Sequence, residues 1–516
     1  MESTHELSHA VVNTSKINSV EENHHNNINN LPQDVLLAIF RELLLTVREP
    51  NAALEPLSVG WDDDHLRPWP TYKSMMPRLT FTETLGTVCR HWRGVMSLAS
   101  LFWTRLVIWV GKNATPLSQI REYLAWSRAR LIDIYILQTS RMRLGWRPPE
   151  DEAQVKAHVK AALETLSPHM KRWRTLRIEV LHSSSLPRIR ADLVGHADML
   201  STLDFEFTTD DCVASTGADS QVAGEFHTPL LENLSIGGLQ FRESYVDPPA
   251  STSMLPRLRH LKVTNYDDSE HPPFPLVDLL RFLVNCDFDD LHSLDLANLH
   301  LACSYKGPPI REGRDIWCHE VSFTDMGGDV IVEYNRLLGY PFAEVVKYSR
   351  CSLKDLSELG ESDIIRMEDI DEPQSVMCFL SDSRWESPCT TLAFTACCGL
   401  TPEVLSMLGQ PMPDGAWFCP YLTSLVIALC GGCTSADLRK LVRARFEVHA
   451  ATGFPHPGDP EFVVTSIVAL EVLMSYELAP EDKEWFDTNL AYVRWDNWEG
   501  GYTRSLQESE AVSRDG

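Results

Sequence analysis

Apolar side chains recur at helical spacing over residues 31–47. The positions are Leu31, Val35, Leu36, Ile39, Phe40, Leu43, Leu44 and Val47. This spacing places them on one face of an α-helix. Asn30 can cap that helix, and Asp34 lies in its positively polarised first turn. The pattern therefore predicts one strongly amphipathic helix.

A second apolar stripe follows after an interruption. Residues 49–78 contain five prolines and the run Asp62–Asp64, so we predict a long irregular insertion there. A short third helix is predicted at residues 98–103, and a strand at residues 106–110 that Gly111 ends. Residues 30–110 should form a three-helix domain with the insertion inside it. The second helix is predicted from Phe81, Leu85, Val88, Cys89, Trp92, Val95 and Met96.

Short strand motifs repeat along the chain beyond Pro116. Their typical forms are Leu-x-Ile, Leu-x-Phe and Leu-x-Val, and between residues 176 and 294 they follow one another after 27, 31, 27 and 33 residues. Helices alternate with them, as in Val155–Leu166 and in Leu438–Phe446, which Ser435 can cap. The motifs lie at residues 134–136, 176–178, 203–205, 234–236, 261–263, 294–296, 321–323, 392–394, 425–427 and 470–472.

This repetition predicts an α/β fold in which strands and helices alternate and the strands form a parallel sheet. Each repeat exposes an apolar face that only its neighbours can cover, so residues 117–500 should stack as a solenoid. The region 324–387 departs from the rhythm and its repeats are not placed. The polar segments 1–29 and 505–516 lack apolar periodicity and are expected to be disordered.

Length, charge and cysteine content narrow the function classes. A chain of 516 residues exceeds the size of one hydrophobic core, which agrees with at least two structural units. The formal net charge of −26, without clustered Lys and Arg, argues against nucleic-acid and membrane partners. No segment has the pattern of a secretion signal or a membrane span. The 13 cysteines lack a disulfide-like spacing, so we expect free thiols in an intracellular protein of the cytoplasm or nucleus.

The N-terminal helical pattern resembles the F-box, the module that binds the Skp1-type adaptor of cullin-RING ubiquitin ligases. The resemblance covers residues 31–110. It depends on Leu31-Pro32, Asp34, Leu36 and Ile39-Phe40, then on Val88-Cys89-x-x-Trp92 and Leu101-Phe102-Trp103. The chain beyond is similar to the irregular leucine-rich repeats of many fungal F-box proteins. Two departures are the insertion at 49–78 and Phe102, where many members have Leu before Trp103.

The resemblance implies a non-catalytic substrate receptor. The F-box would bind the adaptor, and through it a cullin, while the repeats hold a protein substrate whose identity the sequence does not give. A small three-helix unit has more large apolar side chains than it can bury alone, which supports a partner. The alternative is that these side chains pack against the first repeats. The expected adaptor-binding residues are Leu31, Pro32, Val35, Leu36, Ile39, Val88, Trp92, Leu101 and Trp103.

Strand alternation predicts which side chains face the concave side of the solenoid. In the first repeats these are polar: Arg177, Glu179, Asp204, Glu206, His260, Lys262 and Asp295. In the last repeats they are mostly apolar, so we expect substrate to bind there or the chain end to cover them. The expected substrate-binding residues are Ala393, Thr395, Val426, Ala428 and Leu473.

Three other functions compete with this interpretation. The chain could be an interaction scaffold that binds the adaptor without delivering a substrate. Cys430-Gly431-Gly432-Cys433, placed between a strand and a helix, has the form of a thiol-redox motif. The same cysteines with Cys397 and Cys398, and His449 or His456, offer zinc ligands. Stacking of equivalent positions in neighbouring repeats explains these cysteines more simply, so we expect no metal, no cofactor and no enzymatic activity.

Overall fold

The computed structural model of the chain describes residues in several stretches. They are residues 28, 31–48, 81–138, 151–214, 224–247, 255, 257–267, 271–286, 291–310, 318–339, 341–354, 362–381, 389–412, 415–457, 459 and 462–502. The predicted insertion at 49–78, the tail at 505–516, the Asn30 cap and all of the arm at 1–29 except Ile28 lie outside these residues.

Short helices form the first part of the described chain. Cys89 is extended, with φ −160° and ψ 164°, and its sulfur accepts a hydrogen bond of 3.4 Å from the Trp92 backbone N–H. The single helix predicted over residues 81–96 is therefore wrong, because Cys89 ends one helix and caps the next. The elements are α1 (Gln33–Arg48), α3 (Phe81–Val88), α4 (Arg90–Ser97) and the 3-10 helix η3 (Ser100–Trp103).

The strands of the rest of the chain join into one large sheet that follows the order of the sequence. All neighbouring pairs that we resolve are parallel except the last, β16 with β17. Within the described residues the strands are β1 (Arg105–Val110), β2 (Ile132–Gln138), β3 (Trp173–Glu179), β5 (Thr202–Glu206), β7 (Asn233–Gly237), β8 (His260–Tyr266), β9 (Leu291–Leu299), β10 (Cys318–Thr324), β11 (Ala343–Ser349), β12 (Ser362–Glu368), β13 (Thr391–Thr395), β14 (Ser424–Ala428), β15 (Ala469–Leu473), β16 (Tyr492–Trp495) and β17 (Trp498–Gly500).

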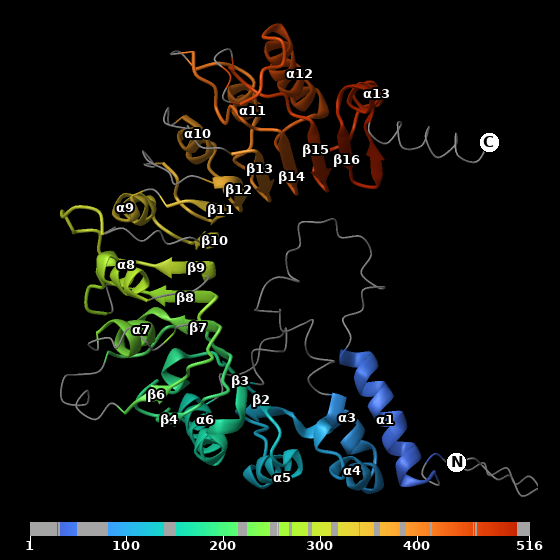
Figure 1. The fold of residues 1–516 in the computed structure, drawn as a ribbon, viewed down its shortest axis with the longest axis vertical. Coiled ribbons are helices and arrows are strands. Elements are labelled where there is room, and N and C mark those ends of the chain that lie inside the picture. The colour runs from blue at the N-terminus through green and yellow to red at the C-terminus, as the bar shows by residue number, and fades with distance from the viewer. Residues whose placement is uncertain are drawn as a thin grey trace, which may run out of the picture.

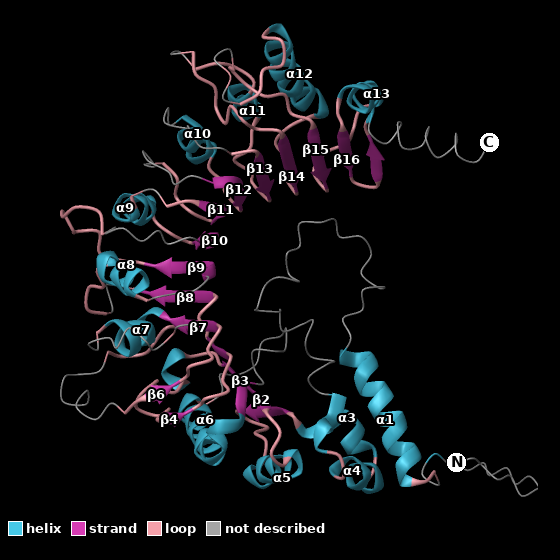
Figure 2. Ribbon diagram, viewed as in Figure 1, coloured by secondary structure: helices cyan, strands magenta, loops and turns pink. Residues whose placement is uncertain are grey.

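The sheet bends into an arc, with strands lining its inside and helices its outside (Figures 1 and 2). A separate pair of short strands, β4 (Gly195–His196) and β6 (Phe226–His227), lies on the outer side. No helix among the described residues is long and apolar enough to cross a membrane. The outer helices are α5 (Leu117–Ser127), α6 (Glu152–Leu166), α7 (Gly238–Phe241), α8 (Leu276–Asn285), α9 (Gly328–Leu338), α10 (Pro373–Ser381), α11 (Pro402–Leu408), α12 (Ser435–Ala451) and α13 (Pro480–Asn489).

The predicted α/β fold with a mostly parallel sheet is confirmed, and each predicted strand motif lies in a strand. The unplaced region 324–387 contributes β11 and β12 with the helices α9 and α10. The predicted cap of α12 is wrong by one residue. Thr434 caps the helix in a reciprocal capping box with Asp437, and Ser435 instead donates a hydrogen bond of 2.6 Å to buried Asp482.

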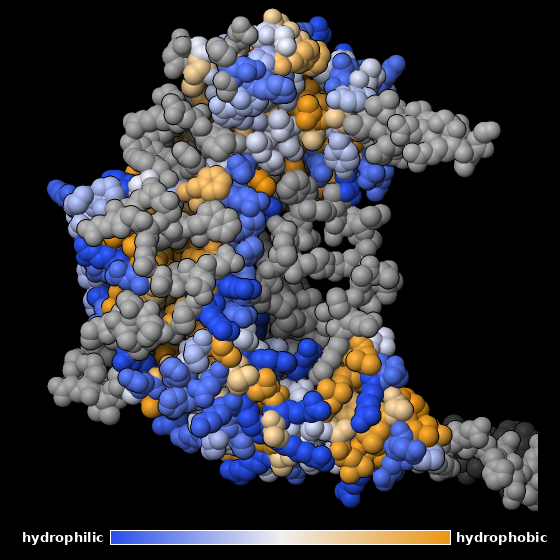
Figure 3. Space-filling view, in the orientation of Figure 1, coloured by the Kyte–Doolittle hydropathy of each residue, from blue (hydrophilic) through white to orange (hydrophobic). Residues whose placement is uncertain are grey.

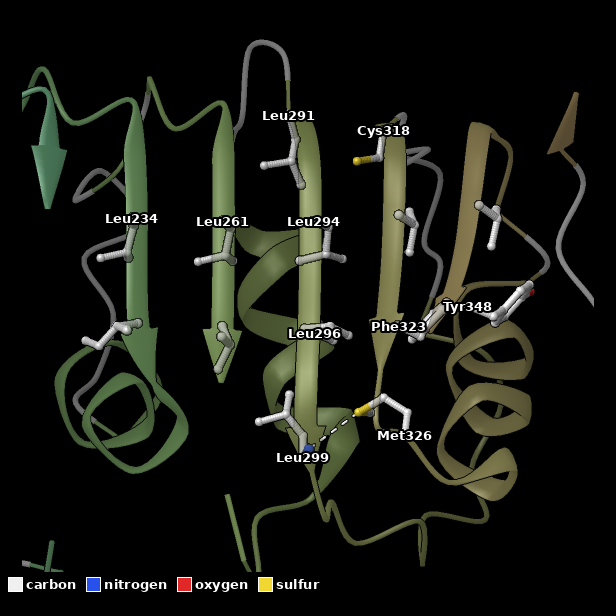
Figure 4. Packing of buried hydrophobic residues seen from close by; sticks show 14 of the residues in the cluster. Leu234, Leu261, Leu291, Leu294, Leu296, Leu299, Cys318, Phe323, Met326 and Tyr348 are labelled. Atoms are coloured by element: carbon white, nitrogen blue, oxygen red, sulfur yellow. Dashed lines mark hydrogen bonds between the residues drawn. The ribbon is translucent and has the colours of Figure 1, made fainter. Parts of the chain in front are cut away.

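Equivalent apolar residues of successive strands stack into one continuous core. Leu234, Leu261 and Leu294 pair in register across β7, β8 and β9, and all three are at most 1% exposed (Figure 4). Phe323 and Tyr348 belong to the next layer, in register with Leu296, and their ring centroids are 5.8 Å apart with planes 12° from parallel. Because each repeat supplies only one residue to such a layer, no repeat has a core of its own.

A left-handed residue lies at or directly after the end of each strand from β8 to β16, where the chain turns outward. Its successor points into the core, and several of these successors bond to the neighbouring repeat. The Cys397 N–H donates to the Cys430 sulfur at 3.3 Å, and the Cys430 N–H donates to Ser475 Oγ at 3.1 Å. From β8 onward the left-handed residues are Asn265, Asn298, Asp325, Arg350, Asp369, Ala396, Leu429, Met474 and Asp496.

Candidate functional site

Helix α1 carries two adjacent apolar stripes, and only one of them is buried within the protein. Leu36, Phe40 and Leu44 recur every fourth residue and are at most 4% exposed. The Phe40 ring contacts the Trp92 ring of α4, with centroids 4.9 Å apart. This stripe joins α1 to α4 and stabilises the helical unit.

The second stripe of α1 lies at the surface. Val35 and Leu43, eight residues apart, are 39% and 43% exposed, and Leu45 is 50% exposed. Val88 at the end of α3 and Leu98 after α4 are 56% and 51% exposed. Apolar surface gathers over these helices at one end of the arc (Figure 3). We call Val35, Leu43, Leu45, Val88 and Leu98 the N-terminal apolar surface.

The nine predicted adaptor-binding residues divide by their exposure. Pro32, Val35 and Val88 are exposed, and half-buried positions are Leu31, Ile39, Trp92 and Leu101. Leu36 and Trp103 are corrections, because they are 0% and 2% exposed and belong to the core of the chain itself.

Trp103 is held inside the molecule by contacts to the first repeat. Its ring lies 4.8 Å from Tyr123 and 4.4 Å from Trp126 of α5, between centroids, and its N–H donates to the Met96 carbonyl at 3.0 Å. The helical unit is therefore continuous with the solenoid through Trp103. Sequence reasoning did not predict Leu43, Leu45 and Leu98 as surface positions, although Leu43 is the eighth residue after Val35 in the apolar pattern of α1.

The predicted polar concave face is in part a buried cluster of charges. Arg177 is 5% exposed and its guanidinium lies 3.1 Å from Asp204, 3.1 Å from Glu206 and 3.5 Å from Glu179. Burial raises the pKa of Asp204 to about 6, although Arg177 opposes the shift. Arg177, Glu179 and Asp204 therefore offer little accessible surface, because one arginine serves three surrounding carboxylates. His260, Lys262 and Asp295 remain half-exposed.

The predicted substrate-binding residues form a band across β13, β14 and β15. Ala393 pairs with Val426, and these two are only 6% and 3% exposed. The prediction that both present a surface is wrong, because strands about 4.8 Å apart shield small side chains between larger neighbours. Thr395, Ala428 and Leu473 are half-exposed.

Two larger apolar side chains lie beside that band and were missed by sequence reasoning. Leu429 directly follows β14 and Met474 directly follows β15, and they are 51% and 70% exposed. Both have left-handed backbone, with φ of 58° and 47°. Earlier repeats mostly place Asn or Asp at this corner.

The Cys-x-x-Cys motif is built into the repeat. Cys430 and Cys433 are 0% and 4% exposed, and the Cys433 thiol donates to the Leu400 carbonyl at 3.3 Å. Burial raises the pKa of Cys433 to about 12. Contact between the thiols of Cys397 and Cys430 lowers the pKa of Cys430, and the same contact with burial raises that of Cys397. Because both sulfurs are enclosed, this arrangement does not favour exchange with an external thiol.

The cysteines also do not converge on a metal position. Among the described residues, two groups of three potential ligands have donor atoms within 4.8 Å of one another, and neither contains a cysteine. One group is His196, Asp198 and His227, and the other is Glu152, His182 and Asp211. His449, a suggested zinc ligand, instead contacts Ser466 Oγ through Nδ1 at 2.8 Å.

No family model matches the chain, and no curated protein matches its sequence.

Proposed function

We propose that the protein is the substrate receptor of a Skp1-cullin-F-box type ubiquitin ligase. The N-terminal apolar surface carries the proposal, because it lies on the segment whose sequence resembles an F-box. In this proposal the adaptor covers α1, the end of α3 and the loop after α4. The receptor supplies no nucleophile and acts by holding a substrate near the conjugating enzyme.

The energetics of the surface favour an apolar protein partner. Fully burying a Val or Leu side chain contributes about 1.5–3 kcal/mol, so each half-exposed residue can contribute about 1 kcal/mol on binding. Exposed apolar side chains on neighbouring helices supply the apolar core that stable interfaces contain. A charged ligand would gain nothing from Val35, Leu43 or Leu45.

The position of the surface also fits a receptor. Helix α1 lies at one end of the arc, whereas the inner side of the sheet extends away from it (Figure 1). An adaptor bound at α1 would therefore leave the later repeats open to a second protein. Leu429 and Met474 are the exposed apolar side chains that we assign to that second contact.

The proposal is tested by placing a charge on the apolar surface without disturbing the core. A Val35→Glu/Val88→Glu variant should keep its circular dichroism spectrum and lose at least tenfold in adaptor affinity, measured by calorimetry with a Skp1-type adaptor. Arg41→Gln is the control, because Arg41 is exposed on the same helix and its replacement changes the charge by the same amount as one Val→Glu. Equal adaptor binding by the double variant and the control would contradict the proposal.

A turnover assay separates the receptor from a scaffold that binds the adaptor alone. Proteins that co-purify with the chain should be degraded faster when the wild type is expressed than when the Val35→Glu/Val88→Glu variant is expressed. Unchanged lifetimes, with adaptor binding intact in the wild type, would favour the scaffold.

A further inference from the structure

Two histidines lie side by side on the short sheet at the outer side of the arc. His196 of β4 pairs in register with His227 of β6, and their ring centroids are 5.3 Å apart. Asp198 follows two residues after His196, just beyond the end of β4, and its carboxylate lies 3.7 Å from His196 Nδ1, while Ala197 between them is fully buried. The Ala197 N–H donates to the His227 carbonyl at 2.9 Å, which fixes the two backbones together.

These three side chains offer a compact set of metal ligands. His196 Nδ1 and Asp198 Oδ1 are 3.7 Å apart, and one donor atom from each of the three residues lies within 4.8 Å of the others. Tetrahedral Zn²⁺ with bonds of about 2.0–2.1 Å needs donors about 3.4 Å apart. Small side-chain rotations close this difference, since His196 and His227 are exposed and free to turn.

The second group of potential ligands, Glu152, His182 and Asp211, already has hydrogen-bond partners within the protein. In that group the Ser184 hydroxyl donates to Glu152 and, at 3.0 Å, to Asp211, which also accepts the Ser184 N–H at 2.9 Å. His182 Nδ1 lies 3.1 Å from the same carboxylate. These hydrogen bonds stabilise the loop in which the group lies. In the described part of the chain, the ring nitrogens of His196 and His227 have no such hydrogen bonds.

We propose that His196, Asp198 and His227 bind a divalent transition-metal ion of the Zn²⁺ class. Two imidazole nitrogens and one carboxylate oxygen suit such an ion, and water completes its coordination. β4 belongs to the connection between β3 and β5, and β6 belongs to the connection between β5 and β7. The ion therefore fastens two successive repeats on the outer side of the arc, far in sequence from the N-terminal apolar surface.

Zinc calorimetry on the full-length protein, stripped of metal with a chelator, tests the site. The wild type should bind one equivalent of Zn²⁺ that His227→Ala weakens about tenfold or more. His300→Ala is the matched control, because His300 lies at the same 3.7 Å from a carboxylate, that of Asp267, and is similarly exposed but belongs to neither group of three ligands. Binding that is absent in the wild type, or identical in His227→Ala, would overturn the proposal.

A Co²⁺ spectrum distinguishes this site from the cysteines. Nitrogen and oxygen ligands give d–d absorption without a thiolate charge-transfer band, and the signal should disappear in His227→Ala. A thiolate band that His227→Ala leaves unchanged would assign the metal to cysteines and overturn the proposal.

Discussion

Glu83 carries its carboxyl group into the interior of the helical unit. Its Oε2 is inaccessible and has no hydrogen-bond partner among the residues that the structure describes, and burial raises the pKa to about 7, from an ordinary 4.5. Between pH 4.5 and about 7 the folded chain therefore keeps the Glu83 proton, whereas the unfolded chain releases it. Stability from this group is fully present below pH 4.5 and is lost as the pH rises through 7.

Glu83→Gln should remove this pH-dependent loss. The variant should exceed the wild type by about 3 kcal/mol in free energy of unfolding at about pH 8, and the gain should vanish near about pH 4. Urea denaturation at both pH values measures the difference. Glu42→Gln, at an exposed position of α1, should show no such gain. Equal stabilities of Glu83→Gln and wild type at pH 8 would contradict the account.

Arg445 is a buried cation that has no carboxylate partner within the described part of the chain. Burial lowers its pKa to about 10, and the residue is 0% exposed. We expect Arg445→Met to lower the free energy of unfolding by about 3 kcal/mol or more, because several buried carbonyls lose their donor at once. Its acceptors, at 2.8–3.3 Å, are the carbonyls of Leu408, Phe418, Cys419, Pro420 and Thr465.

Calorimetric melting of Arg445→Met and of Arg443→Met provides the comparison. Arg443 is 61% exposed and pairs with Glu447 at 2.7 Å, so its replacement should cost about 1 kcal/mol at most. Similar melting temperatures for the two variants would show that the carbonyl cluster does not need the buried guanidinium.

At the scale of the element, the left-handed residue at a strand end can favour either backbone stability or an exposed apolar side chain. Left-handed backbone costs about 1–2 kcal/mol for an ordinary L-residue, whereas Asn and Asp adopt it more readily. Asn298 and Asp325 follow this preference, but Leu429 and Met474 do not. Positions that break a local rule in this way are common where a side chain serves binding.

Leu429→Asn should raise the free energy of unfolding by about 1 kcal/mol, because the corner loses its strain. The reciprocal Asn298→Leu should lower the free energy of unfolding by a similar amount or more, since the Asn298 side-chain amide also donates a hydrogen bond of 2.9 Å to Asn265 Oδ1. Chemical denaturation of both variants tests the pair. A loss of stability in Leu429→Asn would mean that the leucine is held by contacts that outweigh its backbone strain.

The elements themselves were predictable wherever one physical signal dominated. The Leu-x-Leu strands follow from alternation, because their inward residues stack on the same residues of the next repeat. β11 and β12 were missed, since Val345-Val346 and Ile364-Ile365 place adjacent apolar residues instead of alternating ones. The helix break at Cys89 was not predicted, because apolar residues continue at helical spacing across it.

Contacts between repeats were less predictable. Alternation assigned Arg177 to its face but gave no sign that three carboxylates would enclose it. His196 and His227 are 31 residues apart, which is one repeat length, and only the pairing of β4 with β6 brings them together. The exposure of Val35 beside buried Leu36 follows from helix geometry, but which stripe packs inward depends on α4.

At the scale of the whole molecule, a short helical unit is joined to a long repeat array through Trp103. The array is held by layers that run through every repeat, so it offers a long, rigid inner side of the sheet. The helical unit keeps an apolar surface at the opposite end from β16 (Figure 1). In our account these two surfaces bind two different proteins at once.

Hydrogen–deuterium exchange of the full-length chain, with and without a Skp1-type adaptor, tests this account most directly. We predict that the adaptor slows exchange in residues 33–48 and 81–98 and leaves the amides of β7 to β15 unchanged. No change in α1, or protection confined to the repeats, would contradict the assignment of the N-terminal apolar surface to the adaptor.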